Sequence, residues 1–168
     1  MRKNKLQDVN FAKPNQELLL RSALLSGDEA ISSWRVWKNT ADWEAYLEPG
    51  SFRLLPLLYI NLQKHGVNDP AMSKLKGIYR QAWSKNQTLF HAMANVIRYL
   101  QDAGIRTMLL KGAAMSLRYY KNNGARPMAD IDVLVPWKQA KQAWEFLLKA
   151  GWSTPVPFVE ADLQYGHA

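Results

Sequence analysis

The stretch ARPMADIDVLVP, from Ala125 to Pro136, places two aspartates, Asp130 and Asp132, one residue apart at the start of an apolar run. The alternation of apolar and other residues predicts a β-strand over 129–135. Residues two positions apart on a strand face the same side, so the two carboxylates are expected to point together, with their Cα atoms roughly 7 Å apart. Neighbouring carboxylates repel one another. The pair therefore indicates either a divalent cation between the two side chains or two hydrated aspartates at a strand start.

A second motif lies earlier in the chain, where LLKGAAM at 109–115 reads as the end of a strand that enters a helix. Gly112 in this turn would let a phosphate approach backbone N–H groups at the helix start, where the helix dipole favours anions. Lys111 and Arg126 add positive charge near the two motifs. Oxygen ligands suit Mg²⁺ or Mn²⁺, and Mg²⁺ commonly bridges carboxylates to substrate phosphates. In this order, the motifs predict a metal–polyphosphate site.

The overall composition is compatible with that prediction. The net charge is +8, which favours anionic partners such as polyphosphates or nucleic acid, although a hydrated basic surface is the commoner cause of such a charge. Cysteine is absent, so disulfides and Cys-based metal sites or nucleophiles are excluded, and His65, His91 and His167 are too scattered for a zinc site. No apolar run reaches the roughly 18 residues of a membrane span. We expect a cytoplasmic protein with no membrane partner.

The chain divides into a helical region, 1–103, and an α/β region, 104–168, so the expected fold class is α+β. The most regular apolar series predicts one long helix over 71–103. Its members recur three or four residues apart, with Asn86 at the one polar position: Met72, Leu75, Tyr79, Ala82, Leu89, Met93, Val96 and Leu100. Another helix is expected to begin at Thr40 and to stop at Pro49 and Gly50. The α/β region predicts strands at 105–110 and 129–135, with helices at 112–120 and 136–150.

Together, the two motifs resemble the nucleotidyltransferase superfamily, which is built on the catalytic fold of DNA polymerase β. The most similar subfamily is that of the uncharacterised nucleotidyltransferases, over about residue 15 to the end and most specifically over 105–136. The resemblance implies that Asp130 and Asp132 bind Mg²⁺ or Mn²⁺ and are catalytic. It also implies that Gly112 and Ala113 form the turn that faces the phosphates. For Lys111 and Arg126 we infer phosphate contacts.

The implied activity is transfer of a nucleotidyl group from a nucleoside triphosphate to a hydroxyl acceptor. The acceptor, which can be a protein, a small molecule or an RNA end, stays open, as do the nucleotide base and the oligomeric state. Ala113 stands where the superfamily usually has Ser or Gly. The family's third carboxylate has no clear match, because Glu160 and Asp162 lie in no convincing strand and Glu145 falls within a helix.

The nucleotidyltransferase core is therefore expected to be incomplete at its C-terminal end. The alternative is a non-catalytic nucleotide-binding or scaffold protein that keeps the fold without the third carboxylate. Two enzyme classes with similar acidic motifs fit less well. A glycosyltransferase motif follows a larger α/β unit, and a haloacid dehalogenase motif follows its strand, whereas here the apolar strand continues after the aspartates.

Overall fold

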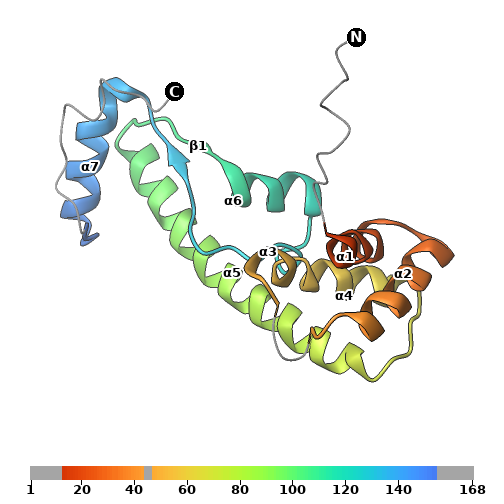
Figure 1. Ribbon diagram of the computed structural model, residues 1–168. Coiled ribbons are helices and arrows are strands. Elements are labelled where there is room, and N and C mark those ends of the chain that lie inside the picture. Colours follow the sequence, from red (N-terminus) through yellow and green to blue (C-terminus); the bar gives the residue numbers. More distant parts are fainter. Residues whose placement is uncertain (1–12, 44–46, 155–168) are drawn as a thin grey trace, which may run out of the picture. The chain divides into compact units, whose positions relative to one another are not determined.

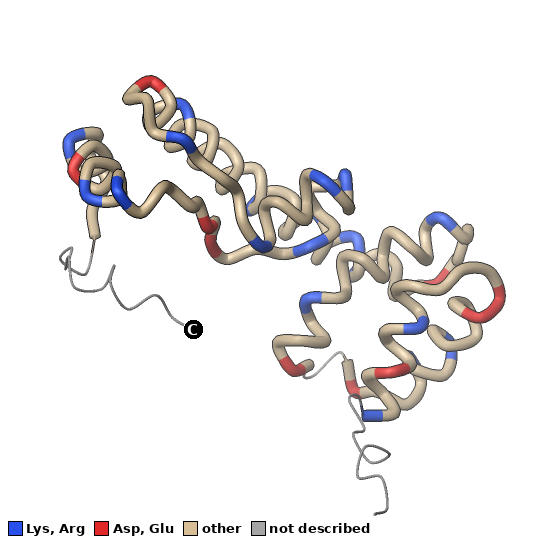
Figure 2. The backbone as a smooth tube through the Cα atoms, turned by 90° about the horizontal axis from the view of Figure 1, so that it is seen from above, with Lys and Arg blue, Asp and Glu red and all other residues tan. Residues whose placement is uncertain are grey.

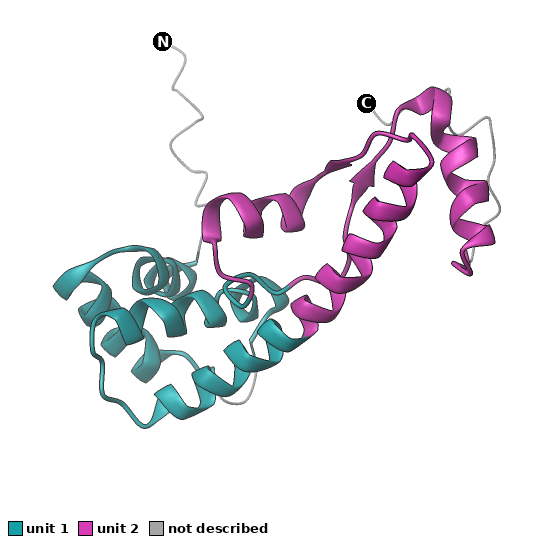
Figure 3. Ribbon diagram, turned by 180° about the vertical axis from the view of Figure 1, so that it is seen from behind, with its two compact units in different colours: residues 1–84, 124–127 teal, residues 85–123, 128–168 magenta. Residues whose placement is uncertain are grey.

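The computed structural model describes residues 13–43 and 47–154. The chain forms two compact units, which are described separately (Figure 3). The first contains residues 1–84 and 124–127, and the second contains residues 85–123 and 128–168. The sequence boundary was placed at 103, near the end of a long helix that contributes residues to both units. The described residues are mostly helical with a small antiparallel sheet, so the fold class is α+β, as predicted.

The first unit is helical (Figure 1). It consists of α1 (Pro14–Leu24), α2 (Gly27–Thr40), α3 (Pro49–Phe52), α4 (Leu55–Lys64) and the first part of α5 (Ala71–Asp102). Proline stands in the first turn of α1, α3 and α4, where its missing N–H costs no helical hydrogen bond. Gly66, after α4, has the left-handed φ of 66° that favours glycine at a helix end.

Three tryptophans form the centre of this unit's core. The ring centroids of Trp34, Trp37 and Trp43 lie 5.8 to 6.1 Å apart, which is the range of favourable aromatic pairs. Leucines from three helices, α1, α4 and α5, belong to the same cluster and are fully buried: Leu19, Leu55, Leu58, Leu62 and Leu75. Burial of each such side chain contributes about 1.5–3 kcal/mol relative to exposure, so this cluster stabilises the unit.

The prediction of a helix that begins at Thr40 was wrong. Thr40 is the last residue of α2, and Ala41 follows in an extended conformation. The extended backbone leads to Trp43, which is buried in the aromatic cluster. Pro49 and Gly50 open α3 instead of closing a helix. Burial of Trp43 offers a physical reason for the break, because a local start signal at Thr40 is weak beside the burial of a large aromatic ring.

Helix α5 confirms the long helix predicted from the apolar series, since its 32 residues run from Ala71 to Asp102. Its burial is uneven. Leu75 and Leu100 are fully buried, whereas Leu89 and Met93 are only partly buried. Asn86, the polar member of the series, is fully buried. None of the helices in the described ranges is long and apolar enough to cross a lipid bilayer.

The end of α5 is a complete glycine-terminated motif. The N–H of Gly104, whose φ is 73°, donates to Gln101 O, and the N–H of Ile105 donates to Leu100 O. Leu100 and Ile105 are both buried, and they form the second unit's small core with Ala143. This is the Schellman arrangement with its hydrophobic contact. It ends the helix and directs the chain towards the first strand.

The second unit contains the rest of α5, then β1 (Met108–Leu109), α6 (Lys111–Met115), the π-helical turn η1 (Ser116–Tyr120) and β2 (Val133–Leu134). A 3₁₀ turn, η2 (Trp137–Gln139), precedes α7 (Ala140–Lys149). The strands are antiparallel, with Met108 opposite Leu134 and Leu109 opposite Val133.

Both strands are shorter than the predicted 105–110 and 129–135. At one end the chain turns into α6 at Lys111, which ends the pairing. At the other end Pro136 has no N–H to donate to a ladder. Pro136 precedes η2, so the predicted helix at 136–150 begins as a 3₁₀ turn and becomes α-helical only at Ala140.

Candidate functional site

The turn between β1 and α6 has an unusual backbone. Lys111 has a φ of 46°, in the left-handed region that residues with a Cβ rarely occupy. Leu110, before it, is fully extended. The sequence placed the special residue of this turn at Gly112, but Gly112 lies in the first turn of α6 and is not among the glycines with positive φ. The left-handed residue is therefore a lysine.

The strand ladder brings this turn to the aspartate segment. The N–H of Leu110 donates to the carbonyl oxygen of Asp132 at 3.0 Å, which extends the β1–β2 register by one pair. The side chains of the next residues then meet, with Lys111 Nζ at 3.1 Å from Asp132 Oδ1. The Lys111 side chain is 73% exposed and the Asp132 side chain is 35% exposed. The structure thus joins two predicted site residues that are 21 positions apart.

Asp130 lies two residues before Asp132 in a segment that is not part of a regular strand, and it is exposed. The predicted strand over both aspartates is therefore confirmed only from Val133 onwards. The expectation that both carboxylates share one face stays a prediction.

Gly112 and Ala113 lie at the start of α6, immediately after Lys111 in the chain. Ala113 is buried and has no hydroxyl to offer a phosphate.

A buried amide anchors the loop that leads to the aspartates. Asn86 Nδ2 donates to the carbonyl oxygen of Asn123 at 2.5 Å, and Asn86 Oδ1 accepts from the N–H of Met128 at 3.1 Å. Asn86 is fully buried, and Met128 is also buried, two residues before Asp130. Asn86 was not among the residues predicted to be functional. The sequence did contain a signal for it, because Asn86 is the one polar side chain at a core position of the helical series.

Arg126 is exposed in the 124–127 segment, which clusters with the first unit. Its predicted role in phosphate binding stays a prediction. Lys and Arg positions occur along the helices of both units (Figure 2). Net positive charge by itself therefore does not mark a site, and the candidate site depends on the particular residues around Lys111 and Asp132.

A comparison with protein families identifies a match over residues 39–167 to a family described as "Uncharacterised nucleotidyltransferase". The chain belongs to this family. The matched range covers most of the chain and includes the β1–α6 turn and the aspartate segment. Comparisons with curated proteins and with solved structures gave no significant match. The resemblance inferred from the two motifs is thus confirmed at the level of the family.

The carboxylates of this nucleotidyltransferase family member are suited to a hard divalent cation. Asp130 and Asp132 offer only oxygen ligands, and both are open to solvent to some degree. Mg²⁺ is commonly held by one or two carboxylates, with water and substrate phosphates completing its coordination. Residues 13–43 and 47–154 contain no cluster of three or more His, Asp or Glu side chains that could hold a metal alone.

The third carboxylate of the superfamily stays an open assignment. Glu160 and Asp162, the two residues considered for it, lie outside the described residues. Glu145 is exposed on α7. Of the three, only Glu145 therefore has a described position.

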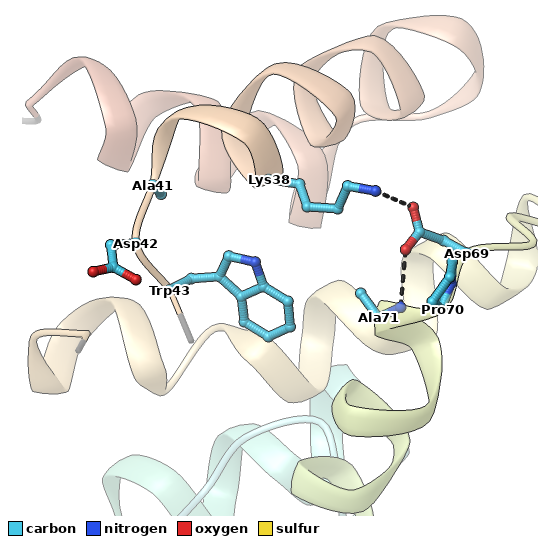
Figure 4. A pocket seen from close by; sticks show the side chains of 7 residues that line it. All are labelled: Lys38, Ala41, Asp42, Trp43, Asp69, Pro70 and Ala71. Atoms are coloured by element: carbon cyan, nitrogen blue, oxygen red, sulfur yellow. Dashed lines mark hydrogen bonds and ion pairs between the residues drawn. The ribbon is translucent and has the colours of Figure 1, made fainter. Parts of the chain in front are cut away.

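A separate pocket in the first unit, of about 380 Å³, surrounds an ion pair (Figure 4). Lys38 Nζ lies 2.7 Å from Asp69 Oδ2, and Asp69 Oδ1 accepts from the N–H of Ala71 at 2.9 Å, at the start of α5. Burial raises the pKa of Asp69, but the hydrogen bonds from Lys38 and the Ala71 amide outweigh burial and hold that pKa below its usual value. The carboxylate caps α5, so we assign this ion pair a structural role.

Proposed function

We propose that this chain binds a nucleoside triphosphate together with Mg²⁺ or Mn²⁺ on a polymerase β-like core, and that its reaction class is nucleotidyl transfer to a hydroxyl acceptor. The observation that carries the proposal is the family match over both motifs, 39–167. The ion pair between Lys111 and Asp132 supports it, because it joins the turn proposed to face phosphate to the segment proposed to hold metal.

In this proposal each predicted residue has a defined task. Asp130 and Asp132 hold the divalent cation, which when bound would link the carboxylates to phosphate oxygens and offset their negative charge. Lys111 and the backbone N–H groups of Gly112 and Ala113 receive the phosphates at the start of the helical segment that α6 and η1 form. Arg126, which clusters with the first unit, keeps its phosphate contact as a prediction from the sequence alone.

Transfer requires more than binding. The acceptor oxygen would form a bond to the α-phosphorus while the bond to pyrophosphate breaks, and a base must take the hydroxyl proton. The residue for that last task is not assigned by the described geometry. The alternative function, nucleotide binding without transfer, differs only in this step, so binding and transfer are measured separately.

The binding test is calorimetric titration of the chain with ATP, GTP, CTP and UTP, each with Mg²⁺ and with a chelator. We expect at least one nucleotide to bind only with Mg²⁺, and Asp132→Asn to weaken it by about tenfold or more, as loss of a ligand contact would. Asp102→Asn is the matched control, because Asp102 is an exposed acid at the end of α5. If no nucleotide binds with Mg²⁺, the proposal fails for this chain.

The transfer test uses the nucleotide that binds, labelled at its α-phosphate, with candidate protein, small-molecule and RNA acceptors. Label that becomes covalently attached to an acceptor supports the enzymatic reading. Metal-dependent binding with no transfer to any acceptor class favours the non-catalytic alternative.

A further inference from the structure

We propose that Lys111 is the resident counter-cation of the aspartate pair, so that a metal ion and a nucleotide bind cooperatively. This inference rests on the proposed function. Without ligands, the Lys111 ammonium pairs with Asp132 at 3.1 Å. Asp132 would exchange this ammonium for a divalent cation when one is bound, and Lys111 would then pair with the triphosphate.

The backbone of Lys111 is the first support. With a φ of 46°, this position would suit glycine on conformational grounds, since a Cβ disfavours the left-handed region. Left-handed residues other than glycine are often found where function requires a particular side chain. The hydrogen bond from Leu110 N–H to Asp132 O holds the strands in register immediately before this residue. The fold thus sets a lysine, in a disfavoured conformation, directly beside a proposed metal ligand.

The exposure of the pair is the second support. The Lys111 side chain is 73% exposed and that of Asp132 is 35% exposed, so this is a surface ion pair, and such pairs are weak. A weak pair neutralises part of the carboxylate charge, yet a divalent ion that carries twice the charge can break it.

Cooperativity follows from the charges. A metal ion that binds alone must displace Lys111 and leave its ammonium beside a dication. A triphosphate that binds with the metal removes that repulsion, because its oxygens accept hydrogen bonds from the ammonium. Coupling of this kind is reciprocal, so the metal must strengthen nucleotide binding by the same factor by which the nucleotide strengthens metal binding.

The test compares wild type, Lys111→Met and Lys121→Met. Lys121 is the matched control, because it is also an exposed lysine with a left-handed φ, of 50°, in the same unit. Mn²⁺ binding is measured without nucleotide from the electron paramagnetic resonance signal of free Mn²⁺. ATP binding in the presence of Mg²⁺ is measured by calorimetry, and circular dichroism checks that each variant is folded.

We expect Lys111→Met to bind Mn²⁺ alone about three- to tenfold more tightly, since displacement of a surface ion pair is no longer needed. The same variant is expected to bind ATP with Mg²⁺ more weakly, by a similar factor. Lys121→Met should change neither affinity by more than about twofold, the effect expected of an exposed, screened charge that makes no contact in the proposal. A higher Mn²⁺ affinity together with a lower ATP affinity is specific to the proposal, because misfolding would lower both affinities.

Three outcomes overturn the inference: unchanged or weaker Mn²⁺ binding by Lys111→Met, an equal gain in Lys121→Met, and no Mn²⁺ binding by any variant. If wild type binds no nucleotide while Lys111→Met alone gains Mn²⁺ affinity, the proposed nucleotide function fails and the counter-cation role of Lys111 stands. If wild type binds ATP with Mg²⁺ and Lys111→Met matches it in both titrations, the proposed function stands and the role of Lys111 is refuted.

Discussion

Replacement of Asn86 by alanine tests how the aspartate segment is held in place. The substitution removes a fully buried amide that bonds the carbonyl oxygen of Asn123 and the N–H of Met128. An intramolecular hydrogen bond contributes about 1 kcal/mol, and a buried polar group left unpaired costs about 1–3 kcal/mol. Two backbone groups lose their partner here, so we expect Asn86→Ala to lower the free energy of unfolding by about 2–5 kcal/mol.

That loss is a large fraction of the roughly 5–15 kcal/mol that stabilises a typical domain. Urea titration followed by circular dichroism measures it. Asn95→Ala is the matched control, since Asn95 lies on the same helix but is exposed, and its partners His91 and Arg98 are exposed as well. The control should change stability by no more than about 0.5 kcal/mol, as is usual for surface substitutions.

Hydrogen exchange separates local from global effects. The amide of Met128 is expected to lose most of its protection in Asn86→Ala, because its acceptor is gone. The reasoning is refuted if Asn86→Ala matches Asn95→Ala in stability, or if the Met128 amide exchanges as slowly as in wild type. Either result would mean that the loop before Asp130 is held by other contacts.

Two further predictions concern the first unit. Gly124→Ala should destabilise the chain by about 1–3 kcal/mol, the cost of overpacking, because an added Cβ would overlap the Tyr79 ring. In a Tyr79→Ala background the same change should cost almost nothing, and a cost that persists in thermal melts would show that the ring is not the obstacle. The lowered pKa of Asp69 predicts that its stabilising contribution is complete above the ordinary aspartate pKa of about 3.9 and is lost as pH falls through the lower folded value. Asp69→Asn should therefore flatten the acid limb of a stability–pH curve below about pH 4, and an unchanged limb would contradict the assignment.

Much of the architecture was predictable because it depends on local spacing. The three- and four-residue recurrence of apolar side chains predicted α5, whose ends the structure places at Ala71 and Asp102. Proline in the first turn of α4 and left-handed glycines after α4, α5 and α7 stand where local rules expect them, since these signals act through the residue's own backbone. The two motifs were also sufficient to indicate the nucleotidyltransferase family.

Other features depend on contacts between residues far apart in the chain. The helix predicted to begin at Thr40 does not form, and Trp43 is instead buried against Trp34 and Trp37. No local sequence pattern shows that these three side chains will meet. The short strands follow from where the chain turns at Lys111 and Pro136, which only the paired register reveals. In the sequence, Asn86 is only a polar exception in an apolar series. The structure shows that its side chain forms hydrogen bonds with the backbone of Asn123 and Met128.

The candidate site also has features that the sequence predicts and features that only the tertiary structure shows. Residue types and their order along the chain were enough to select Lys111, Asp130 and Asp132 as candidates. The left-handed backbone at Lys111 and its ion pair with Asp132 were not predictable, because they arise only when β1 and β2 are aligned with Leu110 opposite Asp132. A sequence determines which groups are available along the chain. The distance between groups 21 residues apart is set by the pairing of strands, which no local pattern encodes.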